Sequence, residues 1–237
     1  MKAMNNEDKK LIVAVFGTAN TGKSTLIEDI VNYEDNKKRD ADKQWTLFGK
    51  DYRQIISERG LKINRDGNEE CQQVIHDTLL QNIIDAVDEP FLKRIIMDRT
   101  ILDSFAYTYW HNKFGKGGIS QSTIEKMWYQ VAKFSRVFDA LMYIPLCECN
   151  DIEVVDDKFR DTNLEYRKQI DKIFNVMWLT LIGDGARMDV IYGSREKRVE
   201  WFYNDKEYLM LHDKNWGYSS FSKFERTIEQ TLNYNGN

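Results

Sequence analysis

The residues best suited to chemistry lie near the start of the chain, where Gly17 to Ser24 read G-x-x-x-x-G-K-S. The two glycines can adopt a positive φ and bring the backbone close to a ligand, so that successive N–H groups point into one concavity. Lys23 can then reach the β- and γ-phosphates of a nucleotide, and the Ser24 hydroxyl can ligate Mg²⁺. The pattern predicts a phosphate-binding loop made of Gly17, Thr18, Ala19, Asn20, Thr21, Gly22, Lys23, Ser24 and Thr25.

The segments on both sides of this loop support the prediction. Residues 11–16 are a run of six apolar residues, which is typical of a buried parallel strand. From Ser24 onward, Leu26, Ile27 and Ile30 fall on one side of a helix. A loop between a strand and a helix N-terminus also gains from the positive end of the helix dipole. We therefore expect the chain to bind ATP together with Mg²⁺.

A second group of functional residues follows a later apolar run. Residues 95–97 are predicted to form a buried strand that ends in Asp98 and Arg99. An acidic residue at this place can bind Mg²⁺ through water or accept a proton from an attacking hydroxyl. Arg99 offers a planar fork for a phosphate, with a purely structural Asp–Arg pair as the alternative. We predict that Ser24 and Asp98 serve the metal ion.

Other strand ends and nearby helices supply candidate acceptor-binding residues. Residues 45–48 are predicted to be the second strand, and ligands of open α/β sheets bind at the carboxyl ends of strands. A long helix predicted at 68–87 and the helix after the Asp–Arg pair would line the same pocket. The candidates are Asp51, Arg53, Gln72, Arg99, Ser104 and Tyr107. Ordinary surface positions are the alternative for the first three.

Basic residues gather in the region of about 150–168, where Arg160 and Arg167 can close over a transferring phosphoryl group and exclude water. Because Asp and Glu are interspersed there, a solvated helix face is the alternative. After the last predicted strand, Gly193 and Ser194 form a turn whose backbone can pack against a purine.

Composition describes an ordered globular chain of 237 residues, long enough for one α/β domain with a sizeable core. The net charge of −4 supplies no bulk basic field for nucleic acid. No apolar run is long enough to suggest a membrane span, and residues 1–10 lack the apolar core of a signal peptide. The three cysteines, Cys71, Cys147 and Cys149, do not indicate a disulfide framework or a metal site, so we expect a reduced, cytoplasmic protein.

The remaining apolar patterns complete a three-layer α/β/α fold. Strands are predicted at 11–16, 45–48, 95–97, 140–146 and 188–192, and helices after 24 and at 54–60, 68–87, 120–138, 164–182 and 220–232. We expect a mainly parallel five-stranded sheet in a single P-loop domain over residues 1–237, with a flexible N-terminus (1–10) and a helical lid (about 150–168). The C-terminal extension (204–237) either covers the core or makes a subunit contact, and a homodimer is left open.

Taken in order, these motifs resemble the P-loop nucleoside and nucleotide kinases over roughly residues 10–203. The run D-R-x-x-x-D-S-x-A-Y that begins at Asp98 is similar to the aspartate–arginine motif of thymidylate kinases. The runs D-x-x-R-D-T-x-x-x-Y-R, ending at Arg167, and Y-G-S-x-x-x-R, ending at Arg198, are similar to the AAA-type ATPase/kinase group that contains ribosylnicotinamide kinases. The loop interior, residues 18–21, lacks the acidic or arginine residue that some thymidylate kinases place there, and residues 32–45 and those after 203 match no element of the family.

The resemblance implies ATP as the donor, Mg²⁺, and an acceptor site framed by the second-strand end and the aspartate–arginine motif. By position, it implies that Lys23 and Ser24 serve ATP and Mg²⁺, that Asp98 acts as base or metal–water ligand, and that Arg99 holds the acceptor. It implies further that two arginines act as lid cations and that a Gly–Ser turn borders the adenine; these residues are Arg160, Arg167, Gly193 and Ser194.

The leading hypothesis is an ATP-dependent phosphotransferase whose acceptor is a nucleoside or deoxynucleoside monophosphate, because Arg53 and Arg99 would bind an existing acceptor phosphate. A nucleoside kinase of the ribosylnicotinamide type is the close alternative. An ATPase or switch is a different class, which the absence of an N-K-x-D motif and of a D-E pair at the strand end disfavours. A polynucleotide 5′-kinase is disfavoured by the negative net charge.

Overall fold

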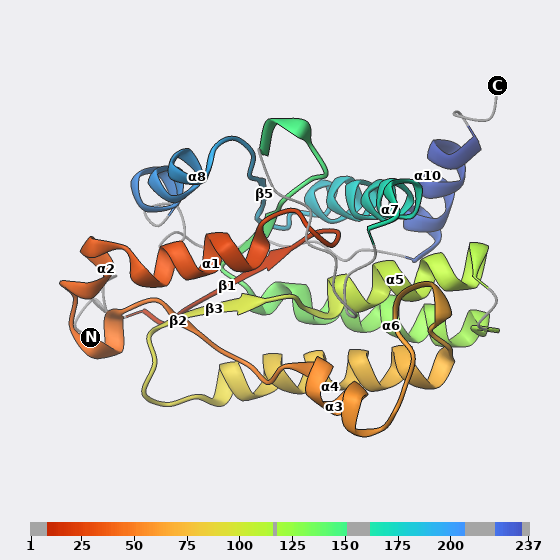
Figure 1. The fold of residues 1–237 in the computed structure, drawn as a ribbon, viewed down its shortest axis with the longest axis horizontal. Coiled ribbons are helices and arrows are strands. Elements are labelled where there is room, and N and C mark those ends of the chain that lie inside the picture. Colours follow the sequence, from red (N-terminus) through yellow and green to blue (C-terminus); the bar gives the residue numbers. More distant parts are fainter. Residues whose placement is uncertain (1–8, 116–117, 151–161, 207–220, 234–237) are drawn as a thin grey trace.

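The computed structural model describes residues 9–115, 118–150, 162–206 and 221–233 (Figure 1). At its centre lies a sheet of five parallel strands in the order β2-β3-β1-β4-β5. The strands are β1 (Leu11–Phe16), β2 (Thr46–Leu47), β3 (Arg94–Asp98), β4 (Ala140–Tyr143) and β5 (Met188–Val190). The predicted α/β fold with a parallel five-stranded sheet is confirmed.

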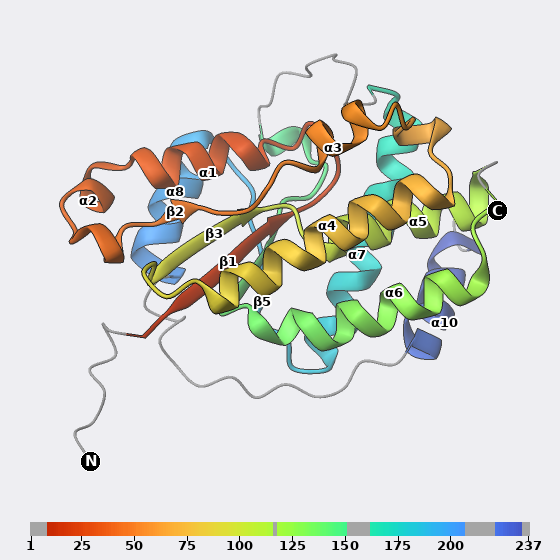
Figure 2. The ribbon, with the colours of Figure 1, turned by 90° about the horizontal axis from the view of Figure 1, so that it is seen from below.

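Helices cover both faces of this sheet (Figures 1 and 2). One face carries α1 (Lys23–Asn32) and α8 (Arg195–Trp201), with the short α2 (Glu34–Lys37) following α1. The other face is covered by α3 (Tyr52–Glu58), α4 (Glu69–Asp88), α5 (Ile101–Phe114), α6 (Gln121–Phe134), α7 (Leu164–Gly183) and α10 (Phe221–Asn233).

The central strand β1 is apolar throughout because it is buried on both faces. Ile12, Ala14 and Phe16 join the core under the larger helical layer, and the alternate residues of the strand join the core under α1 and α8. Since β3 and β4 flank β1 in parallel register, the three strands end at the same edge of the sheet. This register brings the phosphate loop, Asp98 and the segment after β4 together.

Several strands are shorter than the sequence predicts. The strand predicted at 140–146 ends at Tyr143, because Pro145 has no backbone N–H with which to continue the ladder. The strand predicted at 45–48 is limited to Thr46 and Leu47, and Trp45 instead packs its ring against Phe202.

The C-terminal helix α10 covers part of the core. Phe224 and Ile228 on this helix are fully buried, and the Phe224 ring stacks on Trp128 with 4.5 Å between centroids. The sequence left open whether the C-terminal extension covers the core or makes a subunit contact, and its helix α10 covers the core.

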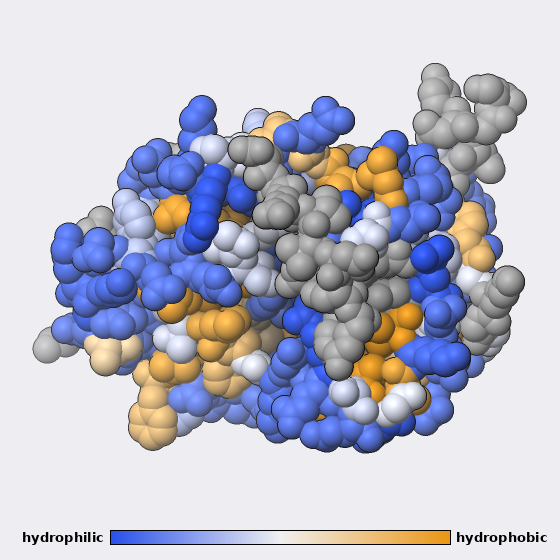
Figure 3. Space-filling view, viewed as in Figure 1, coloured by the Kyte–Doolittle hydropathy of each residue, from blue (hydrophilic) through white to orange (hydrophobic). Residues whose placement is uncertain are grey.

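Hydrophilic residues cover most of the face drawn in Figure 3, with apolar groups between them. Among the described residues, no helix combines the length and apolar character needed to cross a membrane.

Candidate active site

The loop between β1 and α1 has the backbone that its sequence pattern predicts. Gly17, Asn20 and Gly22 have φ values of 143°, 55° and 81°. A Cβ atom on Gly17 would lie 2.4 Å from the Ile144 carbonyl oxygen, so only glycine fits there. Gly22 precedes α1 in the capping position without a side chain, which leaves the helix N-terminus open towards an anion.

Lys23 lies inside the concavity of this loop. Its Nζ donates hydrogen bonds to the carbonyl oxygens of Gly17 (2.8 Å) and Thr18 (2.5 Å), and the residue is 5% exposed. Burial, together with the neighbouring charge of Arg99, lowers the pKa of Lys23 to about 7. A bound anion would raise this pKa again and favour the charged ammonium group.

Ser24 and Asp98, the two predicted metal-binding residues, are in contact through their side-chain oxygens. The Ser24 hydroxyl donates a hydrogen bond of 2.7 Å to Asp98 Oδ2. Asp98 Oδ1 is buried and has no hydrogen-bond partner among the described residues. The same part of the chain holds no group of three or more His, Cys, Asp or Glu side chains suited to a metal ion. An ion at this pair would therefore need further oxygens from phosphate or water, which is the usual arrangement for Mg²⁺.

Arg99 lies at the junction of three adjoining pockets. It lines the pocket of the phosphate loop, a pocket at the end of β2, and a pocket between α4 and α5. Its φ of 69° is unusual for a residue with a side chain, and its N–H donates to the Val15 carbonyl oxygen at 3.1 Å. Its guanidinium carbon lies 5.8 Å from the centroid of the Tyr52 ring. Such a strained residue at a pocket junction is typical of a functional site.

Arg53 approaches the phosphate loop from α3. It lines both the loop pocket and the pocket at the end of β2, and its guanidinium also lies 5.8 Å from the Tyr52 ring centroid. Asp51 accepts a hydrogen bond from the Arg53 backbone N–H and so caps α3, with its own side chain 57% exposed. Two guanidinium groups therefore join Lys23 around one pocket.

The pocket between α4 and α5 collects four of the predicted acceptor-binding residues: Gln72, Arg99, Ser104 and Tyr107. Its other lining residues are Ala19, Tyr52, Ile63, Ile75, Leu79 and Asp103. The Tyr107 hydroxyl accepts a hydrogen bond of 3.1 Å from the Ala19 N–H, which connects the pocket to the phosphate loop. We refer to this space as the acceptor pocket, after the role predicted for these four residues.

Two buried polar residues at the acceptor pocket are absent from the predicted site. Asp103 lines the pocket, is 1% exposed, and has a pKa that burial raises to about 6 against the opposing charges of Lys23 and Arg99. His76 lies behind Ser104, with 2.7 Å between His76 Nδ1 and Ser104 Oγ, and burial lowers its pKa to about 4. The run D-R-x-x-x-D-S was the signal that could have pointed to Asp103.

Arg167 and Arg198 contact the backbone of the phosphate loop. Arg167 donates from Nε to the Ala19 carbonyl oxygen (3.1 Å) and from Nη2 to the Asn20 carbonyl oxygen (2.9 Å). Arg198 Nη1 lies 3.5 Å from the Thr21 carbonyl oxygen. Both residues are almost fully buried, and Arg167 also lines the pocket that Asn20 and Thr21 line, so in this structure its guanidinium supports the loop carbonyls. Arg160, the other predicted lid cation, lies outside the described residues.

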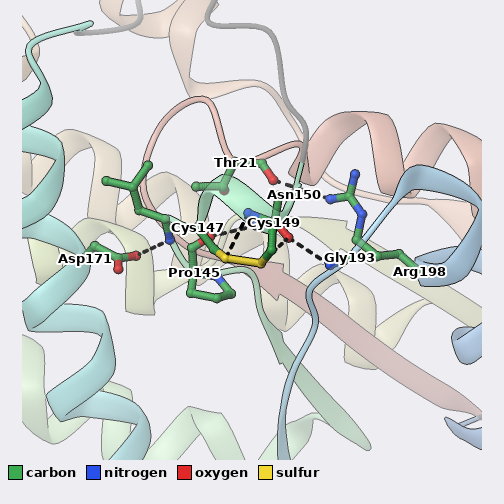
Figure 4. The surroundings of a disulfide bond; sticks show 9 residues. Thr21, Pro145, Cys147, Cys149, Asn150, Asp171, Gly193 and Arg198 are labelled. Atoms are coloured by element: carbon green, nitrogen blue, oxygen red, sulfur yellow. Dashed lines mark hydrogen bonds between the residues drawn. A yellow bond between two sulfur atoms is a disulfide. The ribbon is translucent and has the colours of Figure 1, made fainter.

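The short turn η5 (Glu148–Asn150) follows β4, and a disulfide bond joins Cys149 in this turn to Cys147, which directly precedes it (Figure 4). The turn folds back on itself, since the Asn150 N–H donates to the Cys147 carbonyl oxygen, and the two Cα atoms are 5.2 Å apart. The expectation that all cysteines are reduced is wrong for this pair, while Cys71 is a free buried thiol. This single disulfide bond closes one local turn and does not crosslink distant parts of the described chain.

Asn150 connects this turn to the predicted adenine-side residues. Its Oδ1 accepts a hydrogen bond of 3.1 Å from the Gly193 N–H, and its Nδ2 donates to the Pro145 carbonyl oxygen (Figure 4). Ser194 caps α8 by accepting from the Lys197 N–H. Asn150 and Thr21 line one pocket, and Gly193 is hydrogen-bonded to Asn150 at the edge of this pocket without lining it.

Fold and loop together define a P-loop α/β protein. No protein-family model matches the chain, and no curated protein matches its sequence closely enough to count as a relative. Solved structures do match the fold. A thymidylate kinase from Candida albicans superposes with a TM-score of 0.58 over 90% of this chain and 98% of its own, at 13% identity.

Two further structures carry the same fold. A deoxyadenosine kinase from M. mycoides with bound dATP has a TM-score of 0.55 over 83% of this chain and 99% of its own, at 16% identity. A NadR protein in complex with NR has a TM-score of 0.53 and 14% identity; the match covers 98% of this chain, which spans about half of NadR (53%). The chain therefore has the fold of the P-loop nucleoside and nucleotide kinases, as the motifs led us to expect.

Proposed function

We propose that the chain is an ATP-dependent phosphotransferase that moves the γ-phosphoryl group of Mg-ATP to a small nucleotide, with a nucleoside or deoxynucleoside monophosphate as the preferred acceptor. One observation carries this proposal. Arg53 and Arg99 line both the phosphate-loop pocket and the pocket at the end of β2, and they add two guanidinium groups to Lys23. Such a cluster of positive charge suits a second phosphate or a phosphoryl group in transfer better than it suits one bound nucleotide.

The residues of the loop would bind and orient the donor. The backbone N–H groups at the start of α1 and the Lys23 ammonium group would receive its phosphates, and Arg167 would keep the loop in the required shape. Arg99, held by its strained backbone, would orient the acceptor phosphate towards the same point. Catalysis would then consist mainly of positioning and of charge neutralisation.

Ser24 and Asp98 fit a magnesium ion. Their side-chain oxygens are in contact, and the second Asp98 oxygen is buried without a hydrogen-bond partner in the described part of the chain. Mg²⁺ bound there would neutralise negative charge that develops on the phosphates.

A nucleoside kinase is the second candidate, and the fold likeness to a deoxyadenosine kinase and to NadR supports keeping it. The second observation in its favour is the buried Asp103 carboxylate beside Arg99, because a carboxylate can accept the proton of an attacking hydroxyl. A nucleoside would, however, offer no phosphate to Arg53.

The variant Asp98→Asn tests the proposed role of the Ser24–Asp98 pair. We expect ATP binding to be retained and phosphoryl transfer to fall by at least 100-fold, because the amide loses the negative charge. Asp77→Asn, the same change on the exposed side of α4, is the matched control and should leave both unchanged. Unchanged transfer in Asp98→Asn would contradict the proposed role.

A further inference from the structure

One carboxylate oxygen of Asp103 accepts a hydrogen bond from the backbone, and the other has no partner among the described residues. Asp103 Oδ2 accepts the hydrogen bond of the Thr100 N–H (3.0 Å) and completes the capping box at the start of α5. Oδ1 is buried and accepts no hydrogen bond among the described residues. The residue lines the acceptor pocket and is only 1% exposed. A residue that lines the acceptor pocket therefore carries a buried carboxylate oxygen with no hydrogen-bond partner in the described part of the chain.

Helix capping alone does not account for this arrangement. A capping box needs one acceptor oxygen at this position, and Oδ2 provides it. Burying an ionisable group with an unsatisfied oxygen is costly unless a donor reaches it. An Asn or Gln would provide the cap without the charge. The position is therefore better explained by a hydrogen-bond donor that arrives with a ligand.

The place of Asp103 within the pocket indicates which part of a ligand it meets. Ala19 of the phosphate loop and Arg99 line the same pocket as Asp103, so a ligand in this pocket meets Asp103 beside the phosphate loop. Gln72 and Ile75 on α4 contribute another part of the lining. In a nucleoside or nucleotide, the group next to the reacting phosphate or 5′-oxygen is the pentose, and its ring hydroxyls are hydrogen-bond donors.

We propose that Asp103 accepts a hydrogen bond from a pentose hydroxyl of the acceptor, so that the enzyme selects acceptors that carry this hydroxyl. The proposal rests on the proposed function, and it holds for either a nucleotide or a nucleoside acceptor. Asp103 is a specificity-determining residue in this view, and the phosphate-binding role stays with Lys23 and Arg99.

The test combines the substitution Asp103→Asn with removal of a pentose hydroxyl from the acceptor. Ribonucleoside monophosphates and nucleosides are compared with their 2′-deoxy and 2′,3′-dideoxy counterparts, using the wild type and Asp103→Asn. A hydrogen bond to a charged group in a buried site is worth about a 10- to 100-fold change in kcat/KM, so the wild type should lose this much with the hydroxyl. For Asp103→Asn, removing the hydroxyl should change kcat/KM less than about threefold. The KM of this variant for ATP should equal that of the wild type.

The exposed variant Asp77→Asn is the matched control and should discriminate as the wild type does. Equal hydroxyl dependence in the wild type and Asp103→Asn would overturn the proposal. So would a wild type indifferent to the hydroxyl, a result that needs no variant. If no acceptor is phosphorylated, the proposed function fails, and calorimetric binding of the same compounds decides: hydroxyl-dependent binding lost in Asp103→Asn supports the role of Asp103, and any other result refutes it.

Discussion

Replacing Arg167 with methionine distinguishes two roles for this residue. The sequence predicts a lid cation, whereas in the structure the guanidinium donates to the Ala19 and Asn20 carbonyl oxygens at 3.1 and 2.9 Å. Each hydrogen bond from a charged donor is worth about 1.5–3 kcal/mol, and the cost of burying the charge offsets part of the sum. We therefore expect the free energy of unfolding to fall by about 2–3 kcal/mol, which lowers the Tm of a chain of this size by about 4–12 °C.

The same substitution should weaken ATP binding. Asn20 is held at a φ of 55°, a conformation that costs roughly 1–2 kcal/mol in a non-glycine residue, and loss of the brace lets the loop relax. We expect the Kd for ATP to rise about tenfold, as measured by calorimetry. Lys126→Met, an exposed change on α6, controls for the loss of one positive charge. A normal Tm and a normal ATP Kd with a reduced kcat would refute the brace and favour the lid cation.

Arg99→Ala should raise the KM for the acceptor at least tenfold with ATP affinity unchanged; an equal loss of ATP affinity would place Arg99 on the donor side. The folded-state pKa of Asp103, about 6 against 3.8 for the free group, means that the folded protein binds the extra proton, so stability falls as pH rises from about 4 to 6. Above pH 6, the free energy of unfolding of Asp103→Asn should therefore exceed that of the wild type by up to about 3 kcal/mol, as measured by urea titration. This difference should shrink towards pH 4, and a difference that does not change with pH would contradict the prediction. Cys147→Ser should lose about 1–2 kcal/mol of stability, since the Cys147–Cys149 loop is short, and a dithiol reductant should lower the Tm of the wild type only.

The sequence was sufficient for the central elements of the fold and for the phosphate loop. The six apolar residues of β1, the glycines at 17 and 22 and the lysine at 23 act through local backbone and chain order, so their pattern can be read directly. The position of Asp98 could also be predicted from the sequence, because a charged residue at the end of a buried strand must lie at the edge of the sheet. Gln72, Ser104 and Tyr107 meet in one pocket because α4 and α5 pack side by side.

What the sequence could not provide are contacts that depend on tertiary placement. Arg167 is 147 residues away from Asn20 in the chain, and only the packing of α7 shows that its guanidinium points at the loop carbonyls. The burial of Asp103 likewise follows from the elements that pack around it and not from its neighbours in sequence. The disulfide depends on the backbone of a single turn, which an isolated C-x-C does not specify.

In the proposed function, a phosphoryl group passes from ATP to a small acceptor in this site. Release of ADP from Mg-ATP tests this transfer when it is measured against a panel of nucleosides and nucleoside monophosphates, including ribosylnicotinamide and a 5′-hydroxyl oligonucleotide. We predict rapid ADP release with a nucleoside monophosphate and a matching amount of phosphorylated acceptor. Release of ADP that no acceptor changes would contradict the account and make the chain an ATPase or a nucleotide-driven switch.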